Sequence, residues 1–588
     1  MRRSLAPFLL LAALSGFYLA TLAPSLNWAD GARMQLDVMF GGSTYWSFDE
    51  ARQVATDGLP FDRLGAAAWD HPVYVMLAQG FIALPFAEPL YAVNLMSAFF
   101  GVLAIMVVYA INLSLVREPW IAVLGSLALA VAHTFWFHAV TSENYTLHLF
   151  FMSLLVLLAL RWSRHQQAGD LGWFALIAGL GLANHIMLAL TVAPLCIFII
   201  VTTPLPGEQR SGLRRLFSPG GYAGFARKLG GRRLFVLAGL FTLGLAPWWI
   251  QFIRMARIIG FPLTLQIAAG FPWLGHRMNA GSPLALLFHL LGYGGWLLFQ
   301  FTLFGVIAGF YGFWKMKRTR PEAVWLFLLL ITIHVLFSAN YTLADQFNFH
   351  LPSYLLFSFG ITWGLLEIWG SLRKRMLFSN TTWRAALYAI TLAIITSPVG
   401  LYAAAPSLLR TAGFTEARLN IPPIGQGNRD AFEYFLDPNT HGDDSAARFA
   451  RSTLTQLAPN ALVFTPKPSD QETYVVLRYV QLIESARPDI HLELMLFDPV
   501  DDIRQGILEL ALSQAGCRPE YLASLNPTVY PLEALRAHFE IIPEANLYRL
   551  LPLEAPQSTT ATTTCPPVDA RWRGIPFEQM LRLVMRGR

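Results

Sequence analysis

Apolar runs of about 20 residues recur along the first part of the chain, with short polar segments between them. An α-helix needs about 20 apolar residues to cross the hydrocarbon core of a bilayer, so each run predicts a transmembrane helix. Together they predict about eleven such helices, at residues 5–23, 92–116, 120–138, 146–161, 171–183, 186–203, 234–253, 284–314, 324–339, 353–370 and 385–405.

Basic residues predict how these helices are oriented. Arg2 and Arg3 precede the first run, and Lys and Arg concentrate in cytoplasmic loops, so we place the N-terminus inside. Further basic clusters follow at residues 210–233, 315–320 and 373–384. Residues 25–91 then form a long first outer loop. Its apolar segment 72–86 is short for a span and is interpreted as an interfacial helix. The alternative, a true span, would reverse every later loop against the basic clusters.

The composition becomes that of a soluble domain from about residue 406. Alternating strands and helices are predicted at residues 461–465, 473–486, 490–497, 502–515 and 539–551. An odd number of spans places this part outside. The sequence therefore predicts a polytopic α-helical membrane domain, residues 1–405, and an outer-facing, periplasmic α/β domain with a loose tail, residues 406–588.

Composition supports a membrane protein. Of the 588 residues, 55% are hydrophobic and 14% are charged, whereas soluble proteins carry about 25% charged residues. The net charge of +6 comes from clusters between apolar runs, which indicates membrane topology and not nucleic-acid binding. Cys196 lies in an apolar run. Cys517 and Cys565 lie in the polar tail, where an oxidising compartment would allow a disulfide and an unpaired state is equally compatible.

Ionisable residues gather in the predicted outer loops, at the end of the helix bundle. They are Asp30, Asp37, Asp70, His71, Glu143, His185, Arg254, Arg257, Asp345 and His350. Carboxylates can act as the general base on a hydroxyl, and arginine and histidine can bind a phosphate. This combination at a membrane edge suits a lipid-phosphate substrate. The alternative is that these loops are polar because water surrounds them. No cluster with metal-ligand spacing is visible.

Six segments match, in order, the motifs of a known family. They are TLAPSLNWAD at 21–30, DHPVYVM at 70–76, AVNLMSA at 92–98, AVTSENYTL at 139–147, GLGLANH at 179–185 and LPSY at 351–354. With these motifs the chain resembles the DUF2723 family of membrane glycosyltransferases. That family includes the TMEM260-type protein O-mannosyltransferases and belongs to the GT-C fold class.

The resemblance implies an enzyme that moves a sugar, mannose or a similar hexose, from a polyprenyl-phosphate donor to a hydroxyl acceptor on a protein or glycan. Asp30 would be the base, and Glu143 would support the acceptor or order the loop. His185 would lie near the lipid phosphate, together with Arg254 and Arg257, which are placed there by position alone. No cofactor is implied. Metal independence is expected because a monophosphate leaving group needs less charge neutralisation than a diphosphate.

The sequence departs from the family pattern after its first acid. The family continues Asp-Ser-Gly-Glu, whereas residues 31–33 are Gly-Ala-Arg here, so Asp37 or Asp70 could replace the missing acid. Asp70 is therefore a further catalytic candidate. The remaining substrate-binding candidates are His71, Asp345, His350, Trp28 and Tyr145.

Plainer assignments stay open. Asp30 could cap a helix, Glu143 could interact with a helix dipole, and His185 could be a polar residue between two helices. The other histidines near the outer face, interpreted as packing or interface residues, are His133, His138 and His148.

Two rival functions are a transporter or flippase for a lipid-linked glycan and a noncatalytic scaffold whose outer domain binds a partner. A transporter would favour inverted repeats and broken helices, and the sequence shows neither. The expected location is the bacterial inner membrane, with many passes through the bilayer.

Overall fold

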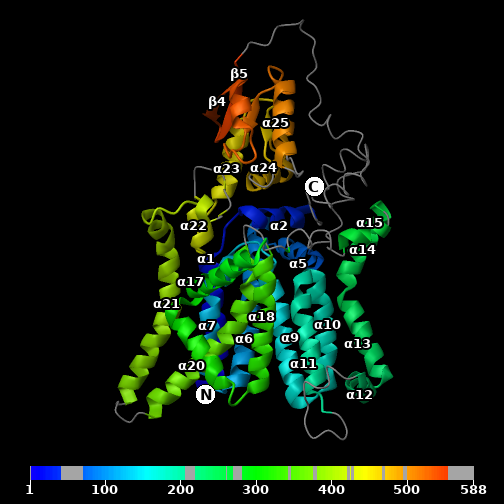
Figure 1. Ribbon diagram of the computed structural model, residues 1–588, viewed down its shortest axis with the longest axis vertical. Coiled ribbons are helices and arrows are strands. Elements are labelled where there is room, and N and C mark those ends of the chain that lie inside the picture. Colours follow the sequence, from blue (N-terminus) through cyan, green and yellow to red (C-terminus); the bar gives the residue numbers. More distant parts are fainter. Residues whose placement is uncertain are drawn as a thin grey trace.

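The computed structural model shows a helix bundle with a smaller, sheet-containing part at one end (Figure 1). Its described residues are 2–40, 71–85, 87–204, 219–259, 261–268, 278, 281–341, 346–374, 380–419, 421, 424, 430–466, 470–493 and 500–553.

Long apolar helices build the bundle. They are α1 (Arg2–Thr21), α6 (Pro89–Val116), α7 (Pro119–Ala130), α8 (His133–Val140), α9 (Tyr145–His165), α10 (Ala168–Asn184), α11 (Ala189–Thr202), α13 (Gly231–Gly244), α14 (Ala246–Ile259), α17 (Pro283–Met316), α18 (Pro321–Asn340), α20 (Leu351–Lys374) and α21 (Asn380–Thr411). Every predicted apolar run is occupied by one or two of these helices.

Fewer helices meet the length and composition expected of a membrane span than the sequence predicted. Among the described residues, six helices are long and apolar enough to cross a membrane, or up to eight if each bent pair counts as one span. The protein is thus a multi-pass membrane protein, and the count of eleven stays a prediction. The bent pairs are α7 with α8, at 74°, and α13 with α14, at 57°. Each of the predicted helices 120–138 and 234–253 therefore consists of two helices joined at a bend.

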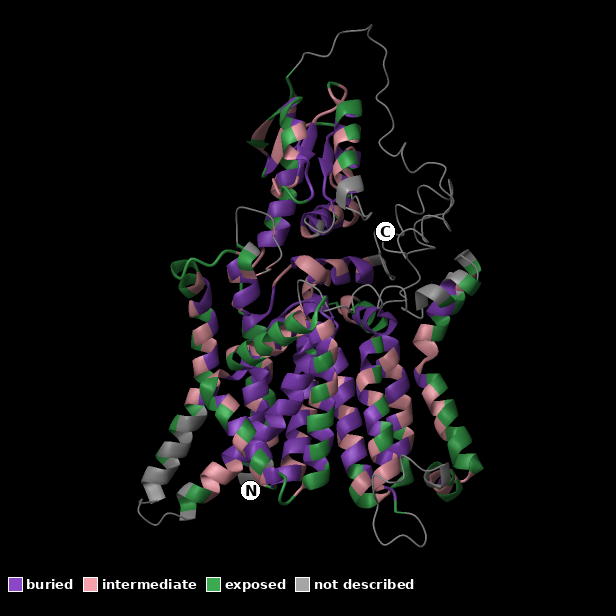
Figure 2. Ribbon diagram, viewed as in Figure 1, coloured by how far each residue is buried: buried purple, intermediate pink, exposed green. Residues whose placement is uncertain are grey.

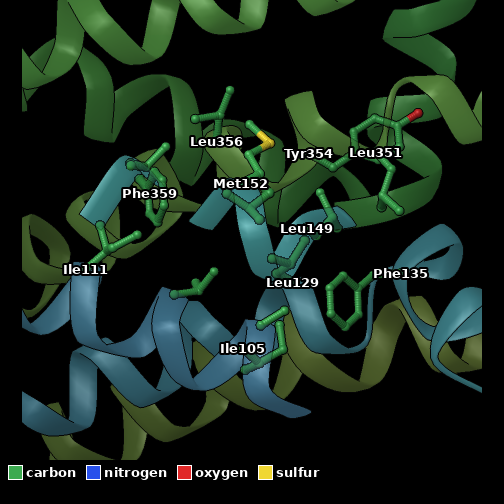
Figure 3. Packing of buried hydrophobic residues seen from close by; sticks show 14 of the residues in the cluster. Ile105, Ile111, Leu129, Phe135, Leu149, Met152, Leu351, Tyr354, Leu356 and Phe359 are labelled. Carbon is green, nitrogen blue, oxygen red and sulfur yellow. The ribbon is translucent and has the colours of Figure 1, made fainter. Parts of the chain in front are cut away.

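Close packing holds the bundle together. Figure 2 shows buried residues on the inner faces of the helices and exposed residues on the outer faces. Figure 3 shows the centre, where Ile105 of α6, Leu129 of α7, Met152 of α9 and Phe359 of α20 belong to one apolar cluster. Dispersion contacts of this kind are what holds helices together in lipid, because lipid tails are as apolar as the side chains.

Two helices lie across the outer end of the bundle. These are α2 (Ala29–Phe40) and α5 (Pro72–Ile82), which pack on each other between the bundle and the sheet-containing part (Figure 1). An α5 of 11 residues is about 16 Å long, far less than the roughly 30 Å of a hydrocarbon core. This length agrees with the interfacial interpretation of segment 72–86.

The C-terminal part contains a five-stranded sheet in the order β2-β1-β3-β5-β4. Strands β1 (Leu462–Phe464), β2 (His491–Glu493) and β3 (Glu520–Leu522) are parallel, and β4 (Phe539–Glu544) and β5 (Leu547–Pro552) form an antiparallel pair. The accompanying helices are α22 (Ala431–Leu436), α23 (Ser445–Gln456), α24 (Gln471–Ile483) and α25 (Val500–Gln514).

The helix before the C-terminal part is longer than predicted, and one of the two tail cysteines is in a disulfide. Helix α21 continues to Thr411, past the predicted domain boundary at residue 405. Cys517 takes part in a disulfide and Cys196 is free, whereas Cys565 lies outside the described residues.

The crossing of α17 and α20 gives a test of the packing. A Cβ added at Gly312 would lie 1.8 Å from the carbonyl oxygen of Gly360, whereas a Cβ at Gly295, on the same helix, would meet nothing within 4 Å. We expect Gly312→Ala to destabilise the protein by about 1–3 kcal/mol, measured as thermal unfolding of the full chain in detergent. The control Gly295→Ala should be neutral or slightly stabilising, because alanine favours helix. Equal melting temperatures for the two variants would contradict this packing.

Candidate active site

A buried polar network fixes the start of the first outer loop. The side-chain amide of Asn94, on α6, donates to the carbonyl oxygen of Ser25 at 3.0 Å, and its oxygen accepts from the hydroxyl of Ser142. The backbone N–H of Ser142 donates to the Asn27 side chain at 2.8 Å, and that of Asn27 donates to Gln35 of α2 at 2.9 Å. The loop start, α2, α6 and the turn between α8 and α9 are thereby joined.

Asp30, the predicted base, lies in the first turn of α2 and is half-buried. No described residue forms a hydrogen bond or ion pair with its carboxylate. The chain turns sharply just before it, since Ala29 has φ of 54°. A Cβ at Gly31 would lie 2.8 Å from the Asn27 side chain, so glycine is needed where α2 passes Asn27. The structure thus presents a carboxylate on a rigidly held turn.

Trp28 is buried among residues of the C-terminal part. Its indole Nε1 donates to the Ser445 hydroxyl at 2.9 Å, and its backbone N–H donates to the Tyr434 hydroxyl at 3.1 Å. The ring packs on Phe449 with centroids 5.3 Å apart, and the side chain is 1% exposed. The ring is enclosed by α22 and α23, and the substrate-binding role of Trp28 stays a prediction. Trp28 docks the first outer loop onto the C-terminal part.

Two buried acids lie near Tyr74 of α5. Glu143 and Asp37 are both buried, and the charge of each acts on Tyr74 of α5. Burial, followed by these two carboxylates, raises the pKa of Tyr74 well above its ordinary value. Ser97 of α6 holds the turn, since the Glu143 backbone N–H donates to its hydroxyl at 3.2 Å. Glu143 thus lies in a buried turn that packs against α6, and both predicted roles, acceptor support and loop ordering, stay predictions.

Histidines form a second group at the same end of the bundle. His71, just before α5, and His148, on α9, flank His185 at the end of α10, with ring centroids 5.0 and 5.2 Å away. Tyr145 lies 6.2 Å from His185 and 4.4 Å from His138. The structure therefore brings together the predicted residues His71, His185 and Tyr145.

Other candidates lie elsewhere. His350 is buried against Tyr293, with centroids 4.9 Å apart, in a separate aromatic cluster. Arg254 and Arg257 are on α14, which packs on α5 and α10, and Arg257 is exposed. The candidates Asp70 and Asp345 lie outside the described residues.

Sequence reasoning missed two residues of this region. Tyr74 was passed over because it lies in an apolar segment, although it faces the two acids. His148 was interpreted as packing, although it follows Tyr145 by three positions. That spacing places both on one helix face and is the signal that could have found it.

The fold defines a class of protein. The structure is similar to the crystal structure of ArnT from Cupriavidus metallidurans in the apo state, with a TM-score of 0.50 and 15% identity over 92% of this chain and 97% of that chain. The architecture is the GT-C glycosyltransferase fold. The structure of the same protein bound to undecaprenyl phosphate has a TM-score of 0.49 and 14% identity, covering 92% of this chain and 97% of that chain. The structure of AglB from Archaeoglobus fulgidus, in complex with an inhibitory peptide and a dolichol-phosphate, has a TM-score of 0.49 and 10% identity, covering 91% of this chain and 72% of that chain.

A family model matches one segment of the chain. Residues 70–206 match the family model described as the protein O-mannosyl-transferase TMEM260 N-terminal domain, which confirms the resemblance to that family. The match includes four of the six motif segments, and the segments at 21–30 and 351–354 lie outside it. No curated protein matches the chain significantly.

The docking of Trp28 is testable by comparison with an exposed tryptophan. Trp28→Ala removes a fully buried ring, and we expect it to destabilise the protein by about 3–5 kcal/mol. Trp173 on α10 is 61% exposed, so Trp173→Ala should change stability little. Thermal unfolding of the full chain in detergent and limited proteolysis between α21 and α22 would measure the effect. If both variants unfold and are cleaved like wild type, Trp28 does not hold the two parts together.

Proposed function

We propose that this protein is a membrane glycosyltransferase that moves a hexose, mannose or a similar sugar, from a polyprenyl-phosphate donor to a hydroxyl acceptor on the outer face of the membrane. The observation that carries the proposal is the match of residues 70–206 to a protein O-mannosyl-transferase domain, within which Glu143 and the histidine group lie at one end of the bundle. The GT-C fold supports it, and so does the carboxylate that α2 presents at that end. A bacterial inner membrane with this end in the periplasm is part of the proposal.

Asp30 takes the proton of the acceptor hydroxyl. The hydroxyl oxygen then forms a bond to the anomeric carbon, and the bond between that carbon and the phosphate oxygen breaks with inversion. The lipid phosphate leaves with the electron pair of the broken bond. Positive and hydrogen-bonding groups near it, from His185 and the arginines of α14, stabilise the negative charge that develops. This scheme uses no metal ion, and metal independence remains part of the proposal.

The other acids have a supporting role. Asp37, on α2 together with Asp30, and Glu143, in the turn before α9, are both buried near Tyr74. They therefore order the loop, and their loss would affect transfer through the position of Asp30.

The broken helices favour one rival, a flippase for a lipid-linked glycan, because transporters often use them. A flippase has no need of a general base. The role of Asp30 therefore separates the two functions.

The test is transfer of labelled sugar in membranes supplied with polyprenyl-phosphate sugars. We expect Asp30→Asn to lower the rate at least about 100-fold, because a general base contributes roughly that much or more. Glu143→Gln should lower it less. The control Asp444→Asn changes an acid in an exposed pair with Arg448 of α23 and should transfer like wild type.

Each outcome separates the alternatives. If Asp30→Asn labels acceptor as fast as wild type at equal abundance, Asp30 is not the base. If wild type transfers no sugar from any donor while moving lipid-linked glycan across the membrane, the flippase function replaces the proposed one.

A further inference from the structure

His148 is a buried histidine that nothing in the fold explains. It lies one turn into α9 and is 2% exposed. Neither of its ring nitrogens has a hydrogen-bond partner among the described residues. A buried polar group without a partner costs about 1–3 kcal/mol, so a residue kept there for packing alone would be better replaced by an apolar one.

The rings around His148 are already held in fixed orientations. Nδ1 of His71 lies 2.7 Å from the carbonyl oxygen of Asn184 and therefore carries a proton. Nδ1 of His185 accepts from the backbone N–H of Met187 at 3.1 Å, so a neutral His185 carries its proton on Nε2. Contacts with the backbone thus fix the orientation of the His71 and His185 rings. Histidines that bind a ligand are commonly oriented by such contacts.

A metal ion does not fit this group well. No group of three or more His, Cys, Asp or Glu side chains within the described residues is placed to hold one. Imidazole N–H groups also bind phosphate oxygens, and charge-assisted hydrogen bonds of this kind are the stronger ones. Helix α14, which carries Arg254 and Arg257, packs on both α5 and α10 and brings positive charge to the same end of the bundle.

The histidine group borders the surface of the bundle at His185. His185 is half-buried, and the next residue, Ile186, is 73% exposed on the outer surface of the bundle. The group therefore lies between an apolar, exposed edge and the buried His148. This arrangement fits a ligand with a phosphate on a long hydrocarbon chain.

We propose that His71, His148 and His185 form the subsite for the phosphate of a lipid-phosphate ligand, with His148 as its deepest member. This inference rests on the proposed function and names the residues that hold the donor. All three lie in the segment 70–206 that matches the family model.

The experiment measures binding without sugar transfer. Purified full-length protein in nanodiscs is titrated with a polyprenyl phosphate, and with the corresponding polyprenol, which lacks the phosphate. His148→Leu should weaken binding of the phosphate lipid about tenfold or more, because a hydrogen bond to a charged group is worth roughly that factor. Binding of the polyprenol should not change. The melting temperature of His148→Leu should stay equal or rise, because an unpartnered imidazole is removed.

Two further variants sharpen the result. His148→Gln keeps a donor and should lose less affinity than His148→Leu. His289, on α17, is bonded to the carbonyl oxygen of Ala339 at 2.6 Å and lies outside the group, so His289→Gln should bind the phosphate lipid like wild type. Inorganic phosphate tests whether the subsite needs the lipid. If inorganic phosphate competes with the phosphate lipid for wild type but not for His148→Leu, the subsite accepts any phosphate. Absence of competition, with the lipid still weakened by His148→Leu, supports a site for the lipid headgroup.

Several results would overturn the inference. Unchanged affinity of His148→Leu for the phosphate lipid would do so, as would an equal loss for phosphate lipid and polyprenol, which would indicate contact with the hydrocarbon chain. Stoichiometric Zn²⁺ binding lost in His148→Leu, with lipid affinity unchanged, would assign a metal site instead. A wild type that binds the phosphate lipid through His148 but transfers no sugar would contradict the proposed function and leave the subsite standing.

Discussion

Asn94 is the side chain on which the outer end of this protein depends. Its buried amide donates to the carbonyl oxygens of Ala23 and Ser25 and accepts from Ser142 and Gln35. Both donors and the acceptor are thus used, which is the condition under which a buried polar network specifies one structure. Loss of the amide would remove the donor to the Ala23 carbonyl oxygen, at a cost of about 1–3 kcal/mol, whereas the Ser25 carbonyl oxygen keeps the Gln35 side chain as a donor at 3.1 Å. The end of α1, the start of α2 and the turn before α9 share this single anchor.

The second anchor of the loop is far away in sequence. Trp28 bonds to Tyr434 and Ser445, more than 400 residues further along the chain. Asp30 follows immediately, so its position depends on the membrane helices through Asn27 and on the C-terminal part through Trp28. A movement of the C-terminal part would therefore be transmitted to the proposed base over two residues of backbone. This arrangement gives the outer part a physical reason to affect catalysis without contacting the substrate.

How far the sequence predicts this structure depends on the range of the interactions involved. Hydropathy located the helices, because the free energy of placing an apolar segment in a bilayer depends only on the residues of that segment. It could not reveal the bend between α7 and α8, since residues 130–132 are Ala-Val-Ala and lack proline or glycine. The contact of Trp28 with the C-terminal part could not be predicted, because a motif does not show which residues far along the chain its side chains contact. The grouping of His71 with His185 was predictable from motifs, whereas the unsatisfied state of His148 becomes visible only with packing.

The two halves of the proposed reaction belong to different parts of the chain. The histidine group lies wholly within residues 70–206, the segment that matches the family model. Asp30 precedes this segment and is held by the C-terminal part. A donor phosphate presents similar chemistry whichever hydroxyl receives the sugar, so the part that binds it has reason to stay alike among related enzymes. Acceptors differ in size and shape. The proposed function therefore places acceptor specificity in α2 and in the C-terminal part that holds Trp28, and under this proposal exchange of that part is expected to change the acceptor and to leave the donor unchanged.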